Sequence, residues 1–162
     1  MDKRHATSKI LVTGGSGYLA SHVVQQLLEE GYYVHTTVRN LKDVVRMQPL
    51  SEMAERFPGK LRIFEADLME EGSFDQAAAG CEAIIHTASP FKISGIRDAM
   101  KELVEPAVNG VRNISGAALR SVSVRRVVLT SSVAASFGVA AALKVNPRGI
   151  SSEEDRNATS SY

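Results

Sequence analysis

A short apolar run that ends in a glycine turn constrains this chain more than any other feature. Ile10-Leu11-Val12 predicts a buried strand, and Gly14, Gly17 and Ala20 follow it at G-x-x-G-x-x-A spacing. Gly14 allows a tight turn, Gly17 lets the backbone approach a pyrophosphate, and Ala20 lets the next helix pack closely. The N-terminus of that helix would present N–H groups to phosphates. The pattern predicts a dinucleotide site, with a ligand-free strand–helix turn as the alternative.

The alternation of apolar periods predicts an α/β fold. Apolar or β-branched runs predict strands at residues 10–12, 32–38, 61–64, 83–86 and 127–130. Apolar residues at helical spacing predict helices at residues 19–28, 44–57, 73–79 and about 95–119. Pro49 should kink or split the second helix, and Pro106 should bend the last one. Strands that alternate with helices predict a doubly wound parallel sheet of order 3-2-1-4-5, a Rossmann fold.

The predicted domain organisation is simple. Residues 1–8 are expected to be an N-terminal tail, and residues 9–143 the dinucleotide-binding domain. Residues 144–162 show no apolar periodicity and are expected to form a polar loop or tail.

Composition excludes several classes of protein. The 162 residues carry 19 Lys and Arg against 18 Asp and Glu, which argues against a nucleic-acid binder driven by bulk charge. No apolar run approaches the ~20 residues that span a bilayer, and the N-terminus lacks the apolar stretch of a secretory signal. Cys81 is the only cysteine, so no internal disulfide can form. We expect a cytoplasmic protein with no metal, no nucleic-acid partner and no membrane partner.

A cation occupies the position where an acid would indicate NAD. An acidic residue about 20 positions beyond the glycines usually binds the ribose 2′-hydroxyl of NAD. Arg39 lies 22 positions after Gly17, and Val38-Arg39-Asn40 offers no carboxylate. Arginine can hold a 2′-phosphate through two parallel charge-assisted bonds, and Lys42 can add a second cation. These residues predict NADP rather than NAD, unless Arg39 is only a solvated loop charge.

Two further strand ends offer candidate cofactor contacts. Asp67 follows the third strand, and its carboxylate can accept the adenine amino group while Leu68 covers the ring. The alternative for Asp67 is a helix or turn cap. Thr87-Ala88-Ser89 follows the fourth strand, and its small side chains let the backbone run beside a cofactor. We interpret His86 as a packed or hydrogen-bonded residue at the strand end rather than a catalyst.

An ordered set of motifs resembles one protein family. The set comprises Thr13-Gly14-Gly15-Ser16-Gly17-Tyr18-Leu19-Ala20-Ser21-His22, Val38-Arg39, Ala66-Asp67-Leu68, Gly80-Cys81, His86-Thr87-Ala88-Ser89-Pro90, Pro106-Ala107-Val108-Asn109-Gly110 and Thr130-Ser131-Ser132. From about Lys9 to Tyr162 the chain is similar to the N-terminal half of an extended short-chain dehydrogenase/reductase. The most similar branch is that of dihydroflavonol reductase and cinnamoyl-CoA reductase. The ordered set is more specific than any single motif.

The resemblance implies NADPH-dependent reduction of a small ketone or aldehyde by hydride transfer. The residue that matches Ser132 hydrogen-bonds the substrate carbonyl in that family, and the residue that matches Asn109 has a supporting catalytic role. Tyr18, Leu19 and Ser131 are expected to contact the cofactor. Two other functions stay open: a non-catalytic NADP-binding or regulatory remnant, and a nucleotide-sugar epimerase or dehydratase.

The family's catalytic Tyr-x-x-x-Lys motif does not occur in the sequence. Tyr162 is the last residue, and residues 153–161 resemble the stretch just before the catalytic tyrosine, so we expect the sequence to stop before it. The 162-residue chain alone is then expected to be inactive. The fifth strand and the long helix would lack neighbours, which predicts self-association through one of them.

Overall fold

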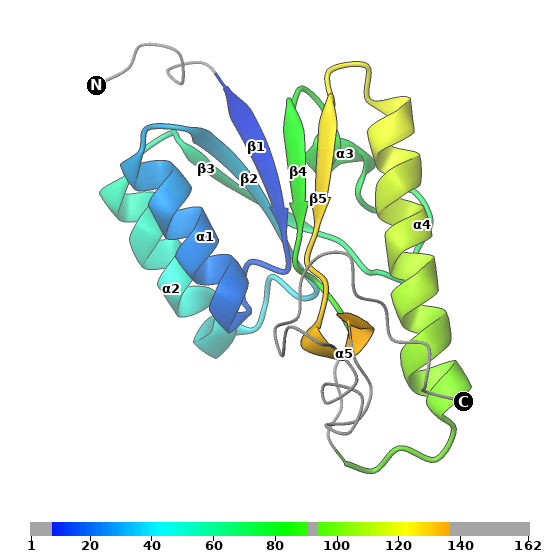
Figure 1. Cartoon of the computed structure of the whole chain (residues 1–162). Helices are drawn as coiled ribbons and strands as arrows, with labels where there is room; N and C mark the ends of the chain where they lie inside the picture. Colours follow the sequence, from blue (N-terminus) through cyan, green and yellow to red (C-terminus); the bar gives the residue numbers. More distant parts are fainter. Residues whose placement is uncertain (1–7, 91–93, 137–162) are drawn as a thin grey trace, which may run out of the picture. The chain divides into compact units, whose positions relative to one another are not determined.

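The sheet of this protein is parallel throughout in the computed structural model, which describes residues 8–90 and 94–136. Its strands are β1 (Lys9–Thr13), β2 (Tyr33–Val38), β3 (Leu61–Glu65), β4 (Ala83–His86) and β5 (Arg126–Leu129). The strand order is β3-β2-β1-β4-β5 (Figure 1), so the predicted Rossmann order is confirmed. The order reverses between β1 and β4, which sets where a ligand can bind.

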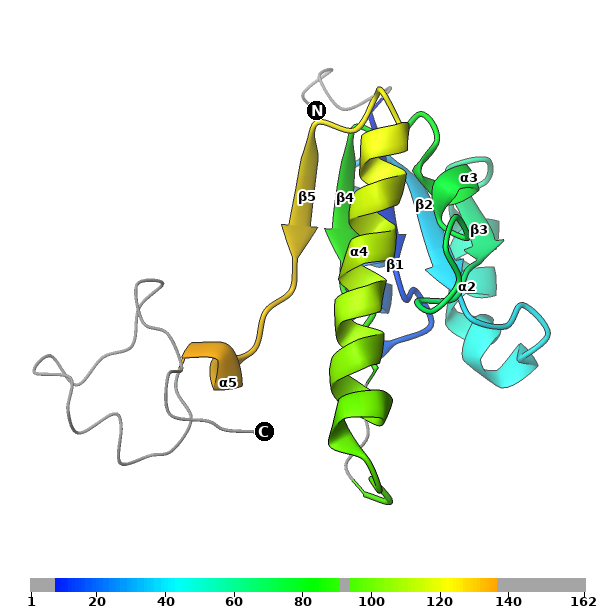
Figure 2. The same ribbon diagram turned by 90° about the vertical axis from the view of Figure 1, so that its right-hand side faces the viewer.

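Helices cover both faces of the sheet. They are α1 (Tyr18–Glu29), α2 (Val44–Arg56), α3 (Asp75–Ala78), the π-helical turn η2 (Met100–Val104), α4 (Glu105–Arg120) and α5 (Val133–Ser136). Helices α1 and α2 lie on one face, and α3 and α4 lie on the other (Figures 1 and 2). The chain divides into two units after Leu129, so residues 130–136, with α5, form a separate element. The predicted polar tail at residues 144–162 lies outside the described residues.

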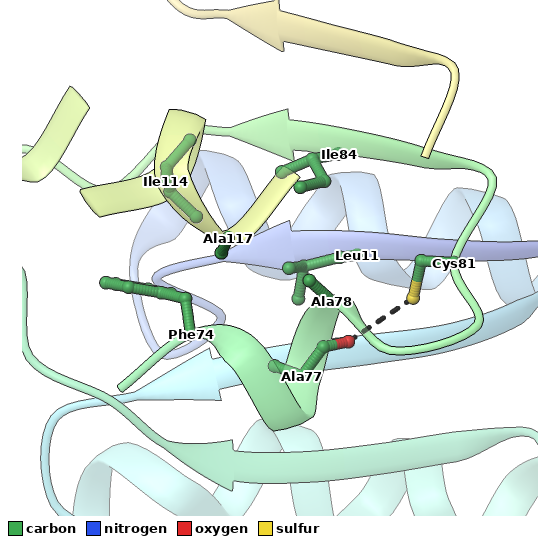
Figure 3. Close-up of a cluster of buried hydrophobic side chains, with 8 residues drawn as sticks. All are labelled: Leu11, Phe74, Ala77, Ala78, Cys81, Ile84, Ile114 and Ala117. Carbon is green, nitrogen blue, oxygen red and sulfur yellow. Dashed lines mark hydrogen bonds between the residues drawn. The ribbon is translucent and has the colours of Figure 1, made fainter. Parts of the chain in front are cut away.

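Adjacent residues of β1 point into two different cores, as expected for a strand buried on both faces. Leu11 belongs to a cluster with α3, β4 and α4 (Figure 3), formed by Leu11, Phe74, Ala77, Ala78, Cys81, Ile84, Ile114 and Ala117. Val12 belongs to a cluster with α1, α2 and β2, formed by Val12, Ala20, Val24, Leu28, Val34, Val38 and Leu50. These two cores fix the carboxyl ends of the central strands between the helix layers.

The prolines predicted to disturb two helices lie in different contexts. Pro49 lies inside α2, which runs unbroken from Val44 to Arg56, so the predicted split is wrong. Pro49 has no N–H for the carbonyl of Val45, but Val45 is 82% exposed, so water can hydrate that carbonyl. Pro106 lies in the first turn of α4, directly after η2, where its missing N–H removes no α-helical bond.

The outer strand β5 is poorly covered. Its four residues are exposed, with Val127 at 41%, Val128 at 47% and Leu129 at 51%. β5 pairs with β4 on one side and is last in the strand order. It therefore presents apolar side chains beside an edge of backbone groups that could pair with another strand.

A buried histidine lies under α3 beside the first core cluster. His35 Nδ1 bonds the carbonyl of Ala77 at 2.7 Å, and the Cys81 thiol donates to the same carbonyl at 3.3 Å. Nε2 of His35 is buried and has no hydrogen-bond partner among the described residues. Burial lowers the pKa of His35 below its ordinary value of 6.5, and the nearby charges of Lys9 and Arg62 lower it further. Burial also raises the pKa of the Cys81 thiol to about 11, so this thiol is not a reactive nucleophile.

We expect the folded state to weaken in mild acid. Because the pKa of His35 is lower in the folded chain, the unfolded chain binds more protons below about pH 6.5, and stability falls as the pH drops. Each such histidine contributes a slope of at most about 1.4 kcal/mol per pH unit. Urea unfolding between about pH 5 and 7.5 should show a shallower pH dependence for His35→Leu. The matched control is His22→Leu, which replaces an exposed histidine. Equal slopes of stability against pH for His35→Leu and the unmodified chain would contradict the account.

Candidate functional site

A cavity of about 410 Å³ lies where the chain leaves the carboxyl ends of β1, β2, β3 and β4. Its lining residues are Gly14, Ser16, Gly17, Thr37, Val38, Arg39, Arg46, Ala66, Asp67, Leu68, Met69, Phe74, Thr87, Ala88, Ser89, Pro90 and Pro106. This edge of a doubly wound sheet is where the fold binds its ligands. The cavity is therefore lined by four loops that lie far apart in the sequence and close together in the fold.

The glycine turn after β1 forms one wall of the cavity. Gly14 has φ +75°, which favours glycine, and a Cβ there would lie 3.1 Å from both Cα and Cβ of Ala88, so a larger residue would strain the turn and crowd the end of β4. The Gly15 amide donates to the Thr37 carbonyl at 2.8 Å, which fixes the turn on β2. Gly17 caps α1, no side chain caps that helix, and its first turn holds no acid. Its N–H groups can therefore bind an anion.

The Thr13 hydroxyl connects the ends of β1 and β4. Its oxygen accepts the amides of Thr87 at 3.2 Å and Ala88 at 3.1 Å and lies 2.8 Å from His86 Nδ1. Because two amides donate to the oxygen, its own proton is available to His86. His86 is buried, and burial lowers its pKa. The interpretation of His86 as a hydrogen-bonded strand-end residue agrees with this arrangement.

Two arginines line the cavity beyond β2. Arg39 follows the strand directly, and it has no ion-pair partner within the described part of the chain. Arg46 lies in the first turn of α2, where Asp43 caps the helix by accepting the Arg46 amide at 3.2 Å. The Asp43 carboxylate also lies 3.5 Å from Arg46 Nε. Lys42, the predicted second cation, is not among the lining residues, whereas Arg46 is.

The loop after β3 supplies an apolar wall and one acid. Leu68 and Met69 line the cavity beside Asp67. One carboxylate oxygen of Asp67 accepts the Met69 amide at 2.8 Å, and Ser73 Oγ donates to the Asp67 carbonyl at 2.8 Å. Asp67 thus caps its own turn, and its second oxygen can still accept from a ligand. The role of Asp67 as a turn cap is therefore compatible with its predicted role as acceptor for the adenine amino group.

The remaining predicted residues do not line the cavity. Tyr18 is 84% exposed and Leu19 is also exposed, and their backbone groups belong to the first turn of α1, where the phosphate is predicted to bind. Asn109 lies on α4 one turn beyond the lining residue Pro106. Ser131 and Ser132 belong to the second unit, where the Ser132 hydroxyl oxygen accepts the Ala134 amide at 3.2 Å and caps α5.

Sequence reasoning missed several lining residues, namely Ser16, Thr37, Val38, Arg46, Ala66, Met69, Phe74, Pro90 and Pro106. Most of them are chain neighbours of residues that were predicted. Arg46 carried a signal of its own, because it stands three positions after Asp43, a good helix N-cap. Pro106 carried none, since its approach to the cavity depends on how α4 packs.

The arrangement suits an extended, anionic ligand with a flat apolar part. Helix α1 and the two arginines offer positive potential, while Leu68 and Met69 offer apolar surface. Within residues 8–90 and 94–136, no group of three His, Cys, Asp or Glu residues could hold a metal ion. In the same ranges, no helix is long and apolar enough to cross a membrane.

Comparisons with known proteins point in the same direction. A sequence model described as the 3-beta hydroxysteroid dehydrogenase/isomerase family matches residues 11–154. The chain is 41% identical over 135 residues to a cinnamoyl-CoA reductase of Medicago truncatula, covering 83% of this chain and 41% of the relative. It is 42% identical over 132 residues to an anthocyanidin reductase of Arabidopsis thaliana, covering 80% of this chain and 37% of the relative. The predicted resemblance to the cinnamoyl-CoA reductase branch is confirmed.

A solved structure gives the same picture of the fold. The structure of Gre2 from Candida albicans in complex with NADPH matches with a TM-score of 0.78 and 31% identity. The match covers 94% of this chain and 45% of Gre2. The chain thus spans less than half the length of each of these relatives.

We predict that the Thr13 hydroxyl is essential for the order of this site. Thr13→Val keeps the shape of the side chain but leaves the amides of Thr87 and Ala88 without their acceptor. The free energy of unfolding should fall by about 1–3 kcal/mol, because buried donors lose their hydrogen bonds. Thr13→Ser keeps the hydroxyl and should lose less. Urea unfolding of both variants tests this, and a valine variant as stable as the unmodified chain would contradict it.

Proposed function

Because the chain belongs to the 3-beta hydroxysteroid dehydrogenase/isomerase family, we propose that it is the cofactor-binding half of an NADPH-dependent reductase of a small ketone or aldehyde. One observation carries the proposal: a glycine turn and two arginines line the same cavity at the carboxyl edge of the sheet. The cinnamoyl-CoA and anthocyanidin reductases among its relatives support a reductase, and the Gre2 complex supports NADPH.

The charges of the cavity favour NADPH over NADH. The pyrophosphate would bind the first turn of α1, which holds no side-chain cap and no acid. The 2′-phosphate would bind Arg39, with Arg46 as the second cation, because both line the cavity and Lys42 does not. The adenine would lie against Leu68, with the second carboxylate oxygen of Asp67 as acceptor for its amino group. The Thr87-Ala88-Ser89 segment would run beside the rest of the cofactor.

The proposed chemistry adds hydride to a carbonyl carbon, and bound NADPH supplies that hydride. Ser132 accepts the Ala134 amide through its oxygen, so its own O–H can hydrogen-bond a substrate carbonyl oxygen and polarise it. The proton that completes the alcohol would come from the tyrosine of the family's Tyr-x-x-x-Lys motif. Asn109 is proposed to support the catalytic groups from α4. Ser131 would contact the cofactor, as would the backbone of Tyr18 and Leu19. The free thiol of the buried Cys81 is consistent with a reducing compartment, and we propose the cytoplasm.

We predict tighter binding of NADPH than of NADH, measured by calorimetry. A bidentate charged contact from Arg39 to the 2′-phosphate is worth roughly one to two decades in affinity. Arg39→Asp should therefore reverse the preference, because a carboxylate repels the phosphate and can accept from a ribose hydroxyl. Arg46→Ala should weaken NADPH binding and leave NADH binding almost unchanged.

A matched control separates this contact from the general charge of the chain. Arg125 precedes β5 at the amino edge of the sheet, away from the cavity, so Arg125→Asp makes the same charge change without touching it. That variant should keep the preference for NADPH. Equal affinities of the unmodified chain for the two cofactors would refute the proposed role of Arg39.

We further propose that the 162-residue chain self-associates through β5, with a second copy as the partner. Antiparallel pairing of two β5 strands can place Val127 opposite Val128 and keep the two Arg126 side chains at opposite ends. Light scattering at about 50 µM should then report dimers or larger species. Val128→Lys should favour the monomer, because a charge on an exposed edge strand opposes pairing. A stable monomer of the unmodified chain would disprove this pairing.

A further inference from the structure

Two residues of helix α4, Gly110 and Asn113, lie against Leu68, which lines the cavity. Pro106 lines the cavity, and Gly110 and Asn113 follow it at i+4 and i+7, on the same face of the helix. Asn113 Nδ2 donates to the Leu68 carbonyl at 2.7 Å. A Cβ on Gly110 would lie 2.8 Å from Cδ2 of Leu68 and 3.3 Å from its Cβ. The helix therefore touches both the backbone and the side chain of Leu68.

These contacts restrict movement of the Leu68 side chain away from the cavity. Gly110 is buried, and Leu68 also packs against the core cluster of Figure 3. The preceding residue, Asp67, is fixed through its carbonyl by Ser73 Oγ at 2.8 Å. Because the loop is held at residue 67 and at residue 68, any added bulk at residue 110 must move the Leu68 side chain or α4 itself.

We propose that Gly110 and Asn113 are positioning residues for the adenine end of the cofactor site. By holding Leu68, they set the room that the cavity leaves for the base. The proposal rests on the proposed binding of NADPH. Neither residue lines the cavity, so their influence on the ligand passes through Leu68. The same helix carries Asn109, so the adenine site and the proposed catalytic asparagine depend on the position of one element.

The test measures the two ends of the cofactor site separately. Gly110→Ala should weaken binding of adenosine 2′,5′-bisphosphate roughly tenfold, because the new methyl group overpacks against Leu68. Binding of inorganic pyrophosphate, which has no base, should be unchanged. Gly116→Ala is the matched control on the same helix, since its Cβ would meet only the flexible Arg120 guanidinium, at 3.0 Å. That variant should bind both probes as the unmodified chain does.

Two further variants keep the inference testable. Leu68→Val removes the Cδ2 atom nearest the new methyl group, so Gly110→Ala should cost less affinity in the Leu68→Val background than in the unmodified chain. Asn113→Leu removes the donor to the Leu68 carbonyl without adding bulk at residue 110, so it should also weaken bisphosphate binding, even if Gly110→Ala fails to fold.

The outcomes separate this inference from the proposed function. If the unmodified chain binds the bisphosphate and Gly110→Ala and Asn113→Leu bind it equally well, the positioning role is wrong and the proposed function stands. Weakening of both probes by the same factor would also overturn the positioning role, because it would indicate a general structural defect. An unmodified chain that binds neither NADPH nor the bisphosphate would overturn the proposed function, and this inference with it.

Discussion

The architecture of the site depends on the hydroxyl of Thr13, which joins β1 to β4 at the point where the strand order reverses. The oxygen accepts two amides from the segment after β4, and its proton is available to the buried His86. This connection keeps Ala88 against Gly14, at a distance that leaves little room for a Cβ at residue 14. The carboxyl ends of β1 and β4 are therefore joined directly beside the cavity, and the loops after β2 and β3 complete its lining.

Charge and apolar surface are divided along the cavity in a way that matches an extended nucleotide. Helix α1 begins at the glycine turn without a side-chain cap among the described residues, and Arg39 and Arg46 lie beyond β2. Asp43, the cap of α2, holds the backbone of Arg46 and so fixes the start of the helix that carries the second cation. Leu68 supplies the apolar wall, and α4 holds it in place. Each wall is thus set by contacts outside the cavity.

The parts of the molecule that could be predicted from the sequence are those written in local patterns. The glycine spacing after Ile10-Leu11-Val12 and the alternation of strands and helices gave the sheet order, and Arg39 follows β2 as predicted. Pro106 was missed because its approach to the cavity depends on how α4 packs, whereas Arg46 stands three positions after Asp43, a helix cap that the sequence does indicate. Helix α2 continues through Pro49, so the predicted split is wrong, and Val45, whose carbonyl loses its helical partner, is largely exposed, which no local pattern reveals.

The central claim is that the cavity after β1, β2, β3 and β4 binds NADPH, and amide chemical shifts during an NADPH titration test it most directly. The account predicts shifts that saturate together at the glycine turn of residues 14–17, at Arg39, at residues 67–69 and at residues 87–88. The amides of β5 before Leu129 should change little, since they lie outside the cavity lining. Shifts that never saturate, or that fall mainly on β5, would contradict the account.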